Sequence, residues 1–371
     1  MGKARSSLGK RIGTAIKWIG SLLGALIVLF ALTVVAIRTY RAAQVKITSS
    51  NGIQESGFVT LNGIRQFLQI RGEDQANPVI VVLHGGPGSP TTFLSSYYQR
   101  TLEQDYTIVN FDQRGSGRTY YENREEGAAL STEAILADTD AIIDYVRERF
   151  GQEKVVVLGH SWGTVLGSTY VKEHPEKVEA YIGVGQCVNN MEGDAFAAEE
   201  GIRRARSSGD EETAQEISAL LRRQTNTKDI PEKFLLTMDI RHAGASYFHY
   251  TGELSMLQTI WLGLTSPDMS LTDMRWFLTL GSSMKNFLRL QQALLADCIG
   301  FDANRLGAYE VPVYYISGEQ DWITPAVLVE DYYETVEAPD KQMRLIPDAG
   351  HTPFLDAPQA FTDTVLELLK K

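Results

Sequence analysis

A serine flanked by two glycines is the first candidate for chemistry. The segment GHSWG at 159–163 places Ser161 directly after an apolar run, Lys154–Leu158, that predicts a buried strand, and just before a predicted helix that begins near Trp162. This strand–turn–helix context is that of a nucleophile elbow, in which two glycines let strand and helix approach while the serine takes a strained conformation that exposes its Oγ. We therefore predict that Ser161 is a nucleophile.

A serine hydroxyl needs a base at neutral pH, and His351 is the favoured candidate among the six histidines. It lies between the last predicted strand and the last predicted helix, and catalytic groups collect in loops at the carboxyl end of such sheets. Asp321 follows the preceding predicted strand and is expected to hold the imidazole in the required tautomer. Glu319 is the alternative carboxylate. The chain order Ser161, Asp321, His351 is typical of nucleophile-elbow hydrolases.

Acyl transfer also requires fixed N–H donors for the developing oxyanion. One donor is expected from the backbone of Trp162, the residue after the nucleophile. The other is expected from HGGPG at 84–88, where a backbone N–H can approach a reacting carbonyl without a side chain in the way. Gly86 is favoured for this role, and Gly85 is the alternative.

Apolar runs that alternate with helical patterns must position these residues. Two short β-like runs, Gly57–Leu61 and Gln66–Ile70, flank an Asn62-Gly63 dipeptide that favours a hairpin turn. Buried strands are predicted at 78–83, 106–111, 154–158, 178–184, 311–316 and 342–346. Strands that alternate with helices predict an α/β fold, a mostly parallel sheet with helices on both faces.

The alternation stops between residues 189 and 304. This segment has helical patterns and no predicted buried strand. We predict that 189–304 is a helical cap, inserted into a core made of 56–188 and 305–371.

The run WIGSLLGALIVLFALTVVAI, from Trp18 to Ile37, contains no charged residue. As a helix with a rise of about 1.5 Å per residue it spans roughly 30 Å, the thickness of the hydrocarbon core of a membrane. A cleaved signal peptide is the alternative. Against it, Arg38 and Arg41 stand where the small-residue cleavage site would be.

Five basic residues precede this run and three follow it closely. The positive-inside rule then places the N-terminus in the cytoplasm. We predict a single-pass membrane protein with an extracytoplasmic catalytic domain. Its N-terminal segments are a basic cytoplasmic tail (1–17), a transmembrane helix (18–37) and a linker (38–55).

Charge is distributed unevenly along the chain. The first 54 residues contain eight of the 35 Lys and Arg residues and none of the 46 Asp and Glu residues. The rest is therefore strongly acidic and repels phosphate backbones, which argues against a nucleic-acid partner. There is no CxxC motif and no histidine cluster at metal-ligand spacing, so no metal is expected. The oligomeric state, and whether Cys187 and Cys298 pair, are left open.

Four motifs together resemble the prolyl aminopeptidase (proline iminopeptidase) branch of the α/β-hydrolases, and the resemblance extends over roughly 56–371. The motifs are HGGPG at 84–88, DQRGSGRT at 112–119, GHSWGT at 159–164 and AGHTP at 349–353.

This resemblance implies an α/β-hydrolase fold and the removal, without a cofactor, of an N-terminal residue, often proline, from a peptide. It implies that Ser161, Asp321 and His351 form a triad, with backbone donors at Gly86 and Trp162. The segment 112–119 is expected to shape the site, and Arg114 within it is expected to be structural.

The cap departs from the family pattern. Proline-specific members carry a Trp-Glu pair there that helps to hold the free amine of the substrate, whereas neither Trp261 nor Trp276 is followed by glutamate. Glu192, at the start of the cap, is expected to hold the ammonium group instead. The alternatives are Glu199, Glu200 and Glu253.

The predicted function is an aminopeptidase that releases an N-terminal proline or a small or apolar residue through an acyl-enzyme. A membrane-tethered carboxylesterase or amidase that acts on a small acyl substrate fits the same triad. A non-catalytic ligand-binding protein on a hydrolase scaffold is a third interpretation. An intact set of Ser161, Asp321 and His351 argues against the third.

Overall fold

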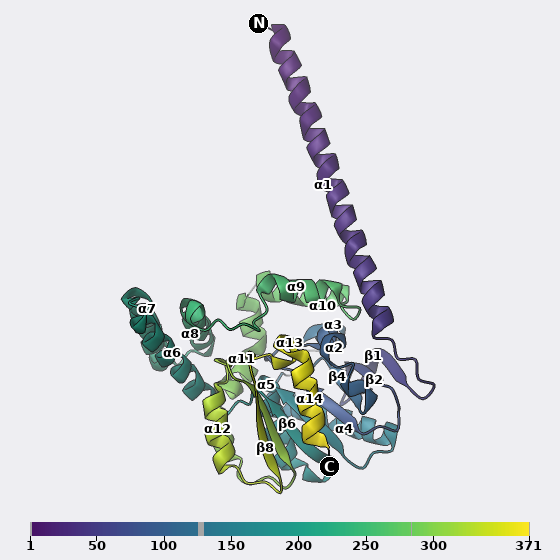
Figure 1. The fold of residues 1–371 in the computed structure, drawn as a ribbon, viewed down its shortest axis with the longest axis vertical. Helices are drawn as coiled ribbons and strands as arrows, with labels where there is room; N and C mark the ends of the chain where they lie inside the picture. Colours follow the sequence, from purple (N-terminus) through teal and green to yellow (C-terminus); the bar gives the residue numbers. More distant parts are fainter. Residues whose placement is uncertain (1, 125–129, 283, 371) are drawn as a thin grey trace.

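Within residues 2–124, 130–282 and 284–370, which the computed structural model describes, the strands form one eight-stranded sheet (Figure 1). Its order is β1-β2-β4-β3-β5-β6-β7-β8. The pairs β1–β2 and β2–β4 are antiparallel, and all other neighbours are parallel, which confirms the predicted sheet. The strands are β1 (Ile53–Leu61), β2 (Ile64–Gly72), β3 (Val79–Leu83), β4 (Thr107–Phe111), β5 (Val155–His160), β6 (Val178–Val184), β7 (Val313–Gly318) and β8 (Lys341–Ile346).

The edge hairpin β1–β2 is longer than its sequence predicts. Its turn is at Asn62 and Gly63, whose φ angles of 48° and 75° suit the tight turn that this dipeptide favours. Pairing continues from the turn as far as Ile53 opposite Gly72. The outer part of β1 carries exposed polar side chains, so backbone hydrogen bonds rather than apolar alternation extend the strand.

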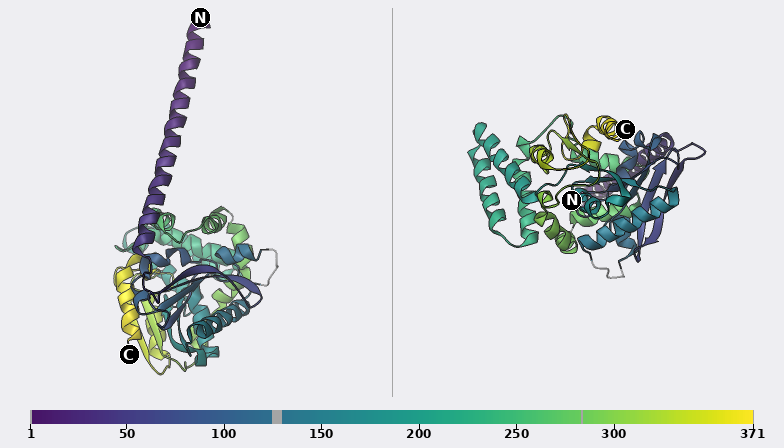
Figure 2. Two further views of the ribbon diagram at one scale, coloured as in Figure 1. Left: turned by 90° about the vertical axis from the view of Figure 1, so that its right-hand side faces the viewer. Right: turned by 90° about the horizontal axis from the view of Figure 1, so that it is seen from below.

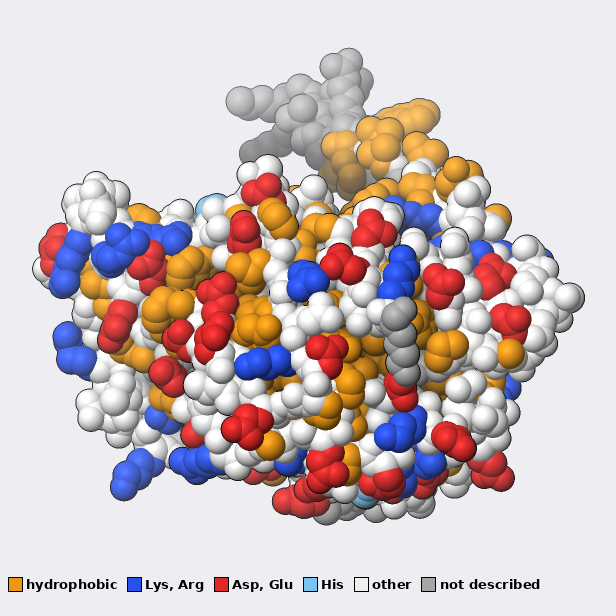
Figure 3. All heavy atoms as spheres, turned by 60° about the horizontal axis from the view of Figure 1, so that its bottom comes forward, with side chains coloured by type: hydrophobic (Ala, Val, Ile, Leu, Met, Phe, Trp, Pro, Cys, Tyr) orange, Lys and Arg blue, Asp and Glu red, His pale blue; other side chains and the backbone are white. Residues whose placement is uncertain are grey.

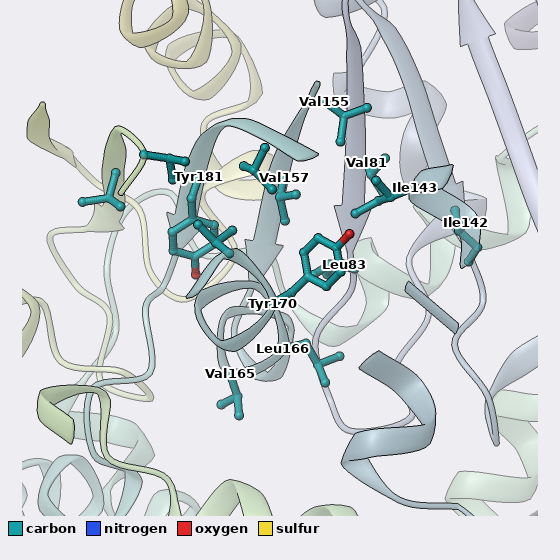
Figure 4. Packing of buried hydrophobic residues seen from close by; sticks show 14 of the residues in the cluster. Val81, Leu83, Ile142, Ile143, Val155, Val157, Val165, Leu166, Tyr170 and Tyr181 are labelled. Atoms are coloured by element: carbon teal, nitrogen blue, oxygen red, sulfur yellow. The ribbon is translucent and has the colours of Figure 1, made fainter. Parts of the chain in front are cut away.

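Helices cover both faces because side chains alternate along the central strands. Val79, Val81 and Leu83 of β3 point into one hydrophobic cluster, while Ile80 and Val82 point into the cluster on the opposite face. Figure 4 shows the first cluster, where Tyr170 and Leu166 pack beside these β3 side chains. This face is covered by α4 (Thr132–Phe150), α5 (Trp162–Glu173) and α12 (Ala326–Thr335), and the other by α2 (Ser95–Tyr98), α13 (Pro353–Asp356) and α14 (Pro358–Leu369).

The short helix α3 (Gly117–Glu122) follows β4. Single-turn 3₁₀ segments occur at Thr92–Leu94, Leu102–Gln104, Pro175–Lys177, Ala245–Tyr247 and Ala303–Arg305.

The chain between β6 and β7 forms a layer of helices at the carboxyl end of the parallel strands. An isolated antiparallel bridge between Asn189 and Asp302 ties together the two points where the chain leaves and rejoins the core. The helices of this layer are α6 (Asn190–Ser207), α7 (Glu211–Asn226), α8 (Ile230–Gly244), α9 (Met256–Thr265), α10 (Leu271–Ser282) and α11 (Met284–Gly300).

The N-terminal helix α1 (Gly2–Gln44) projects from the body, as Figures 1 and 2 show. Its segment Ile16–Gln44 is long and apolar enough to cross a membrane, and most of its apolar side chains are exposed. The predicted linker, 38–55, is helical as far as Gln44 and enters β1 at Ile53. In this part of the helix Arg38 and Arg41 bond to the cap layer.

Candidate active site

Ser161 stands at a sharp turn between β5 and α5. Its φ and ψ angles are 53° and −121°, a conformation that non-glycine residues rarely adopt. Its backbone N–H bonds to Val184 O at 3.0 Å. A Cβ at Gly159 would lie 2.4 Å from Gly163 O, and one at Gly163 would lie 2.0 Å from Leu83 O. The close approach of strand and helix therefore requires both glycines.

Loops after three parallel strands bring Ser161, His351 and Asp321 together. They follow β5, β8 and β7, respectively. His351 Nε2 lies 2.8 Å from Ser161 Oγ, and His351 Nδ1 lies 2.9 Å from Asp321 Oδ2. Because a carboxylate accepts, Nδ1 carries the proton, which leaves Nε2 free to accept the serine proton.

Asp321 is buried and fully hydrogen-bonded. Its Oδ1 accepts from the backbone N–H groups of Ile323 and Thr324, each at 2.9 Å, and Thr324 Oγ1 donates to Oδ2 at 2.7 Å. Burial raises the pKa of Asp321, but the charge of His351 and these hydrogen bonds together hold that pKa below its ordinary value. Glu319, the alternative carboxylate, is exposed to solvent.

The glycine-rich loop after β3 approaches the serine. Gly86 has a φ angle of 126°, and a Cβ there would lie 2.5 Å from Gly88 N, so the loop requires glycine at this position. A Cβ on Gly85 would lie 3.1 Å from Ser161 Cβ. Trp162 is the first residue of α5, and backbone N–H groups in the first turn of a helix have no acceptor within that helix.

His84 and Gln113 connect this loop to α5, and the sequence patterns did not identify them. His84 Nδ1 donates to Gly85 O at 2.8 Å, while its Nε2 accepts from the backbone N–H of Gln113. The Gln113 side chain in turn donates to His84 O at 2.9 Å and accepts from the Trp162 indole at 3.2 Å. The sequence signal that could have pointed to Gln113 was its place in the motif at 112–119.

Arg114 lies in the same motif, but its side chain points to helix α4. Its guanidinium makes a two-pronged ion pair with Asp138, at 2.7 and 2.8 Å. Arg118 reaches the cap, where it pairs with Asp273 of α10 and donates to Asp268 O at 2.6 Å. These arginines hold the motif against its neighbours rather than contacting Ser161.

His160 is a second buried histidine beside the site. Its Nε2 donates to His351 O at 2.8 Å, and its buried Nδ1 has no hydrogen-bond partner among the described residues. Burial lowers the pKa of His160 to about 3, and the nearby His351 charge contributes. Its ring packs edge-on against Phe354 at a centroid distance of 4.9 Å. His160 thereby holds the loop that carries His351.

A cavity of about 230 Å³ lies between the cap and the core, with His351 in its wall. Its lining is mainly apolar and comes from α6, α7 and α8, together with Phe248 and Trp322. The indole N–H of Trp322 is buried and has no hydrogen-bond partner within the described ranges. Glu253 also lines the cavity, and its carboxylate pairs with His249 at 2.5 Å.

Glu192 is placed elsewhere. It is exposed in the first turn of α6, where its backbone N–H bonds to Asn189 Oδ1, and it is not one of the residues that line this cavity. Glu199 is exposed on the same helix. Glu200 is bound by Arg203 and Arg204, which lower its pKa to about 2. The structure therefore brings Glu253, not Glu192, to the cavity beside His351.

Neither cysteine is paired. Cys187 and Cys298 are free thiols, and burial raises the pKa of Cys187 to about 12 and that of Cys298 well above its ordinary value. Neither thiol is a nucleophile at neutral pH. Among the residues that the structure describes, no group of three or more His, Cys, Asp or Glu side chains is arranged to hold a metal ion.

Comparison with known proteins gives a family match for most of the chain. Residues 78–358 match the model of the alpha/beta hydrolase fold. The probable aminopeptidase YbaC of Bacillus subtilis is 28% identical over 310 residues, which are 83% of this chain and 93% of that protein. The proline iminopeptidase of Heyndrickxia coagulans is 22% identical over 329 residues, with coverages of 84% and 98%.

A solved structure agrees in fold. The crystal structure of a proline iminopeptidase-related protein from Thermus thermophilus superimposes with a TM-score of 0.56 at 21% identity. The superposition covers 85% of this chain and 97% of that one.

Proposed function

The chain belongs to the alpha/beta hydrolase fold family, and from that premise we propose that it is a serine hydrolase with Ser161 as its nucleophile. The observation that carries the proposal is the hydrogen-bonded series from Ser161 Oγ through His351 to Asp321, at 2.8 and 2.9 Å. The family match makes the protein a hydrolase, and this geometry supports the serine mechanism.

In the proposed mechanism Ser161 Oγ attacks the substrate carbonyl while His351 Nε2 takes its proton. Asp321 keeps Nδ1 protonated and stabilises the imidazolium. The backbone N–H groups of Trp162 and Gly86 bind the oxyanion. His351 then gives its proton to the leaving amine or alkoxide, which leaves an acyl-enzyme. Water, deprotonated by His351, attacks the ester and releases the acid and Ser161.

Covalent labelling tests the nucleophile. A fluorophosphonate should label the full chain on Ser161, and Ser161→Ala should lose both labelling and turnover while its circular dichroism is unchanged. The triad and its oxyanion donors account for most of the rate, so we expect a loss on the order of 10⁵-fold or more in kcat. Labelling that persists in Ser161→Ala would reject this nucleophile. An unlabelled, inactive wild-type chain would favour the ligand-binding interpretation.

We propose that the substrate is a peptide with a free N-terminus, from which a proline or a small or apolar residue is released. The relatives named above are described as a probable aminopeptidase and a proline iminopeptidase, which supports this class. A cavity of about 230 Å³ is smaller than sites for drug-sized ligands and suits one small residue. We propose Glu253, in its wall, as the carboxylate that holds the ammonium group in place of its pair with His249.

A second candidate is a carboxylesterase or amidase. The apolar lining from α6–α8, Phe248 and Trp322 favours it, because such walls also bind a neutral acyl group. The full chain should be assayed on free-amine prolyl and alanyl arylamides, on their N-acetylated forms and on short acyl esters. Cleavage of free-amine arylamides alone supports the aminopeptidase. Turnover of esters alone supports the esterase.

We also propose that α1 is a retained membrane anchor with the N-terminus in the cytoplasm and the catalytic body outside. The apolar side chains of its central part are exposed, as a lipid-facing helix requires. A cleaved signal sequence is the alternative that also fits the length and composition of this helix. Contacts of α1 with the cap favour retention: Arg41 donates to Thr265 Oγ1 at 2.6 Å.

A further inference from the structure

The outer side of α9 carries large apolar side chains that remain largely exposed. Met256, Leu257 and Ile260 are 76%, 75% and 49% exposed, and α9 contains no charged residue. Trp261 is also exposed, and Leu271 at the start of α10 is 83% exposed. We call these five residues the apolar cap face. A single exposed apolar side chain is ordinary, but a group of this kind marks a binding surface.

The C-terminal part of α1 lies against this face. The rings of Phe30 and Trp261 have centroids 6.2 Å apart. Further along α1, Arg38 donates to Met269 O and, at 3.4 Å, to Pro267 O, in the turn between α9 and α10. Figure 1 shows α9 and α10 on the side of the body from which α1 emerges, with α9 running across the helix rather than along it.

The position of Phe30 along α1 indicates how far the cap reaches into the apolar run. It lies inside the apolar run, seven residues before that run ends at Ile37, which corresponds to about 10 Å along a helix axis. Trp261 is in contact with Phe30 and is therefore at the same level. If α1 crosses a bilayer, α9 therefore contacts the lipid. Interfacial helices insert their apolar faces to a similar depth, about 5–10 Å.

We propose that the apolar cap face docks into the leaflet around α1, so that α9 is an interfacial helix and the partner of this face is a lipid bilayer. The inference rests on the proposal that α1 spans a membrane. Arg38 then lies near the headgroups, and Trp261, at the level of Phe30, lies in the outer part of the leaflet's hydrocarbon. Figure 3 shows a face of the body that is turned partly away from the apolar cap face. This face carries scattered charges of both signs, whereas the surface of α1 is hydrophobic.

Docking places the catalytic cavity beside the lipid surface. Tyr250 and Glu253, which line the cavity, lie in the segment that leads directly into α9. Tyr250 also donates to Asp356 Oδ2 at 2.9 Å, so this segment is attached to the core near His351. A substrate that is itself anchored in the leaflet would therefore reach the cavity without crossing water.

The proposed docking is tested by measuring how deeply fluorescent probes attached to the full chain lie in a bilayer. The chain is reconstituted at low density in phosphatidylcholine vesicles, with an environment-sensitive fluorophore on a cysteine at one of three positions. Leu257→Cys reports on the cap face, Leu26→Cys on the middle of α1, and Ala219→Cys on an exposed site of α7. The wild-type chain, with Cys187 and Cys298 alone, gives the background. Leu257 is exposed, so its replacement spares the fold, and turnover of a water-soluble substrate checks each variant.

Acyl-chain-brominated lipid should quench the probe at Leu257→Cys several-fold more than the probe at Ala219→Cys, and aqueous iodide should quench it several-fold less. Lipid quenching at Leu26→Cys with an aqueous signal at Leu257→Cys would overturn the docking while the anchor stands. Aqueous signals at both would overturn the anchor and the docking together. A Leu257→Cys probe that is shielded from iodide but not quenched by lipid would mean a protein partner, such as a second copy, and would also overturn the inference.

Discussion

Two buried histidines, His84 and His160, support the proposed triad because each remains neutral and donates one ring N–H to a backbone carbonyl. Burial lowers their pKa values to about 4 and about 3, so both rings are neutral at neutral pH. Each donates one ring N–H to a backbone carbonyl, His84 to Gly85 and His160 to His351. Protonation would add a second donor with no acceptor in place, so these hydrogen bonds require neutral imidazoles.

The free energy of unfolding should therefore fall as the pH drops below about 6.5, the ordinary pKa of histidine. The unfolded chain binds protons at both histidines there, while the folded chain does not until the pH approaches 4 or 3, so stability is lost toward acid. Each group contributes a slope of about 1.4 kcal/mol per pH unit. His160→Gln retains an N–H donor and removes one titrating group. The slope of the free energy of unfolding against pH should therefore decrease by the contribution of about one proton, measured by denaturant unfolding between pH 4 and pH 7. An unchanged slope would contradict a neutral His160.

Glu253 and Glu192 make a matched pair for the substrate amine. Glu253→Gln removes the carboxylate that lines the cavity, and a hydrogen bond to a charged group is worth about 1.5–3 kcal/mol. We expect kcat/KM for a free-amine arylamide to fall about 10- to 100-fold, mainly through KM, with little change for the N-acetylated form or an ester. Glu192→Gln, at an exposed position, should behave as wild type. The reverse pattern would restore Glu192 as the anchor.

At the scale of elements, the glycine loop after β3 and the elbow after β5 form one unit. Gln113 bonds both to the loop, through His84 O, and to α5, through the Trp162 indole. The two proposed oxyanion donors therefore belong to segments that are fixed relative to each other. This is the preorganisation that makes such donors effective.

Gly86→Ala should disrupt that unit. Alanine is strained at a φ angle of 126°, and its Cβ would lie 2.5 Å from Gly88 N, so the loop must shift. Loss of one oxyanion donor costs about 10²–10³ in kcat, and we expect a decrease of that order with KM nearly unchanged. Gly57→Ala is the control, because a Cβ there meets nothing within 4 Å. Wild-type kcat in Gly86→Ala would place the second donor at another residue.

The cap and core are joined by the Arg118–Asp273 ion pair, which is nearly buried, with 11% and 3% of the two side chains exposed. Arg118→Ala leaves Asp273 buried without its partner and should lower the free energy of unfolding by about 3–5 kcal/mol. Arg65→Ala breaks the more exposed Arg65–Glu122 pair and should cost at most about 1 kcal/mol. Denaturant unfolding of both variants gives the comparison. Equal costs would show that the buried pair contributes no more than the surface one.

At the scale of the whole molecule, the proposed anchor α1 would hold the catalytic body at a membrane. Its helix continues past the apolar run to Gln44, and Arg38 and Arg41 bond to the cap. A cleaved signal sequence would lose these contacts. The proposed retention would link the anchor, the cap and the cavity in one arrangement.

The protein extracted from membranes should therefore have the intact mass of the full chain, apart from the initiator methionine, and should stay in the membrane fraction after carbonate washing. Protease added outside intact cells should digest the body and spare the N-terminal tail. A mass that lacks roughly the first 40 residues would identify α1 as a signal sequence. Digestion of the tail alone would reverse the proposed orientation.

Local chemistry in the sequence determined most of the core and of the candidate site. Apolar runs mark strands that are buried on both faces, so β3, β4 and β5 were predictable, and the predicted α/β-hydrolase fold is confirmed. The glycines at 159 and 163 are required by backbone clashes at the strand–helix turn. Ser161, Asp321 and His351 could be proposed together because the ends of neighbouring parallel strands meet at one edge of a sheet.

Only the tertiary structure decided which groups of the cap face that edge. Glu192 and Glu253 are equivalent in sequence, as polar residues at or near the ends of helices, and both are exposed, yet only Glu253 lines the cavity. The neutral state of His160 and the contact of Phe30 with Trp261 are likewise set by packing between distant segments. Local periodicity specifies which face of a helix is apolar, but the burial of a particular side chain depends on how whole helices cross the sheet, and no short window of sequence contains that information.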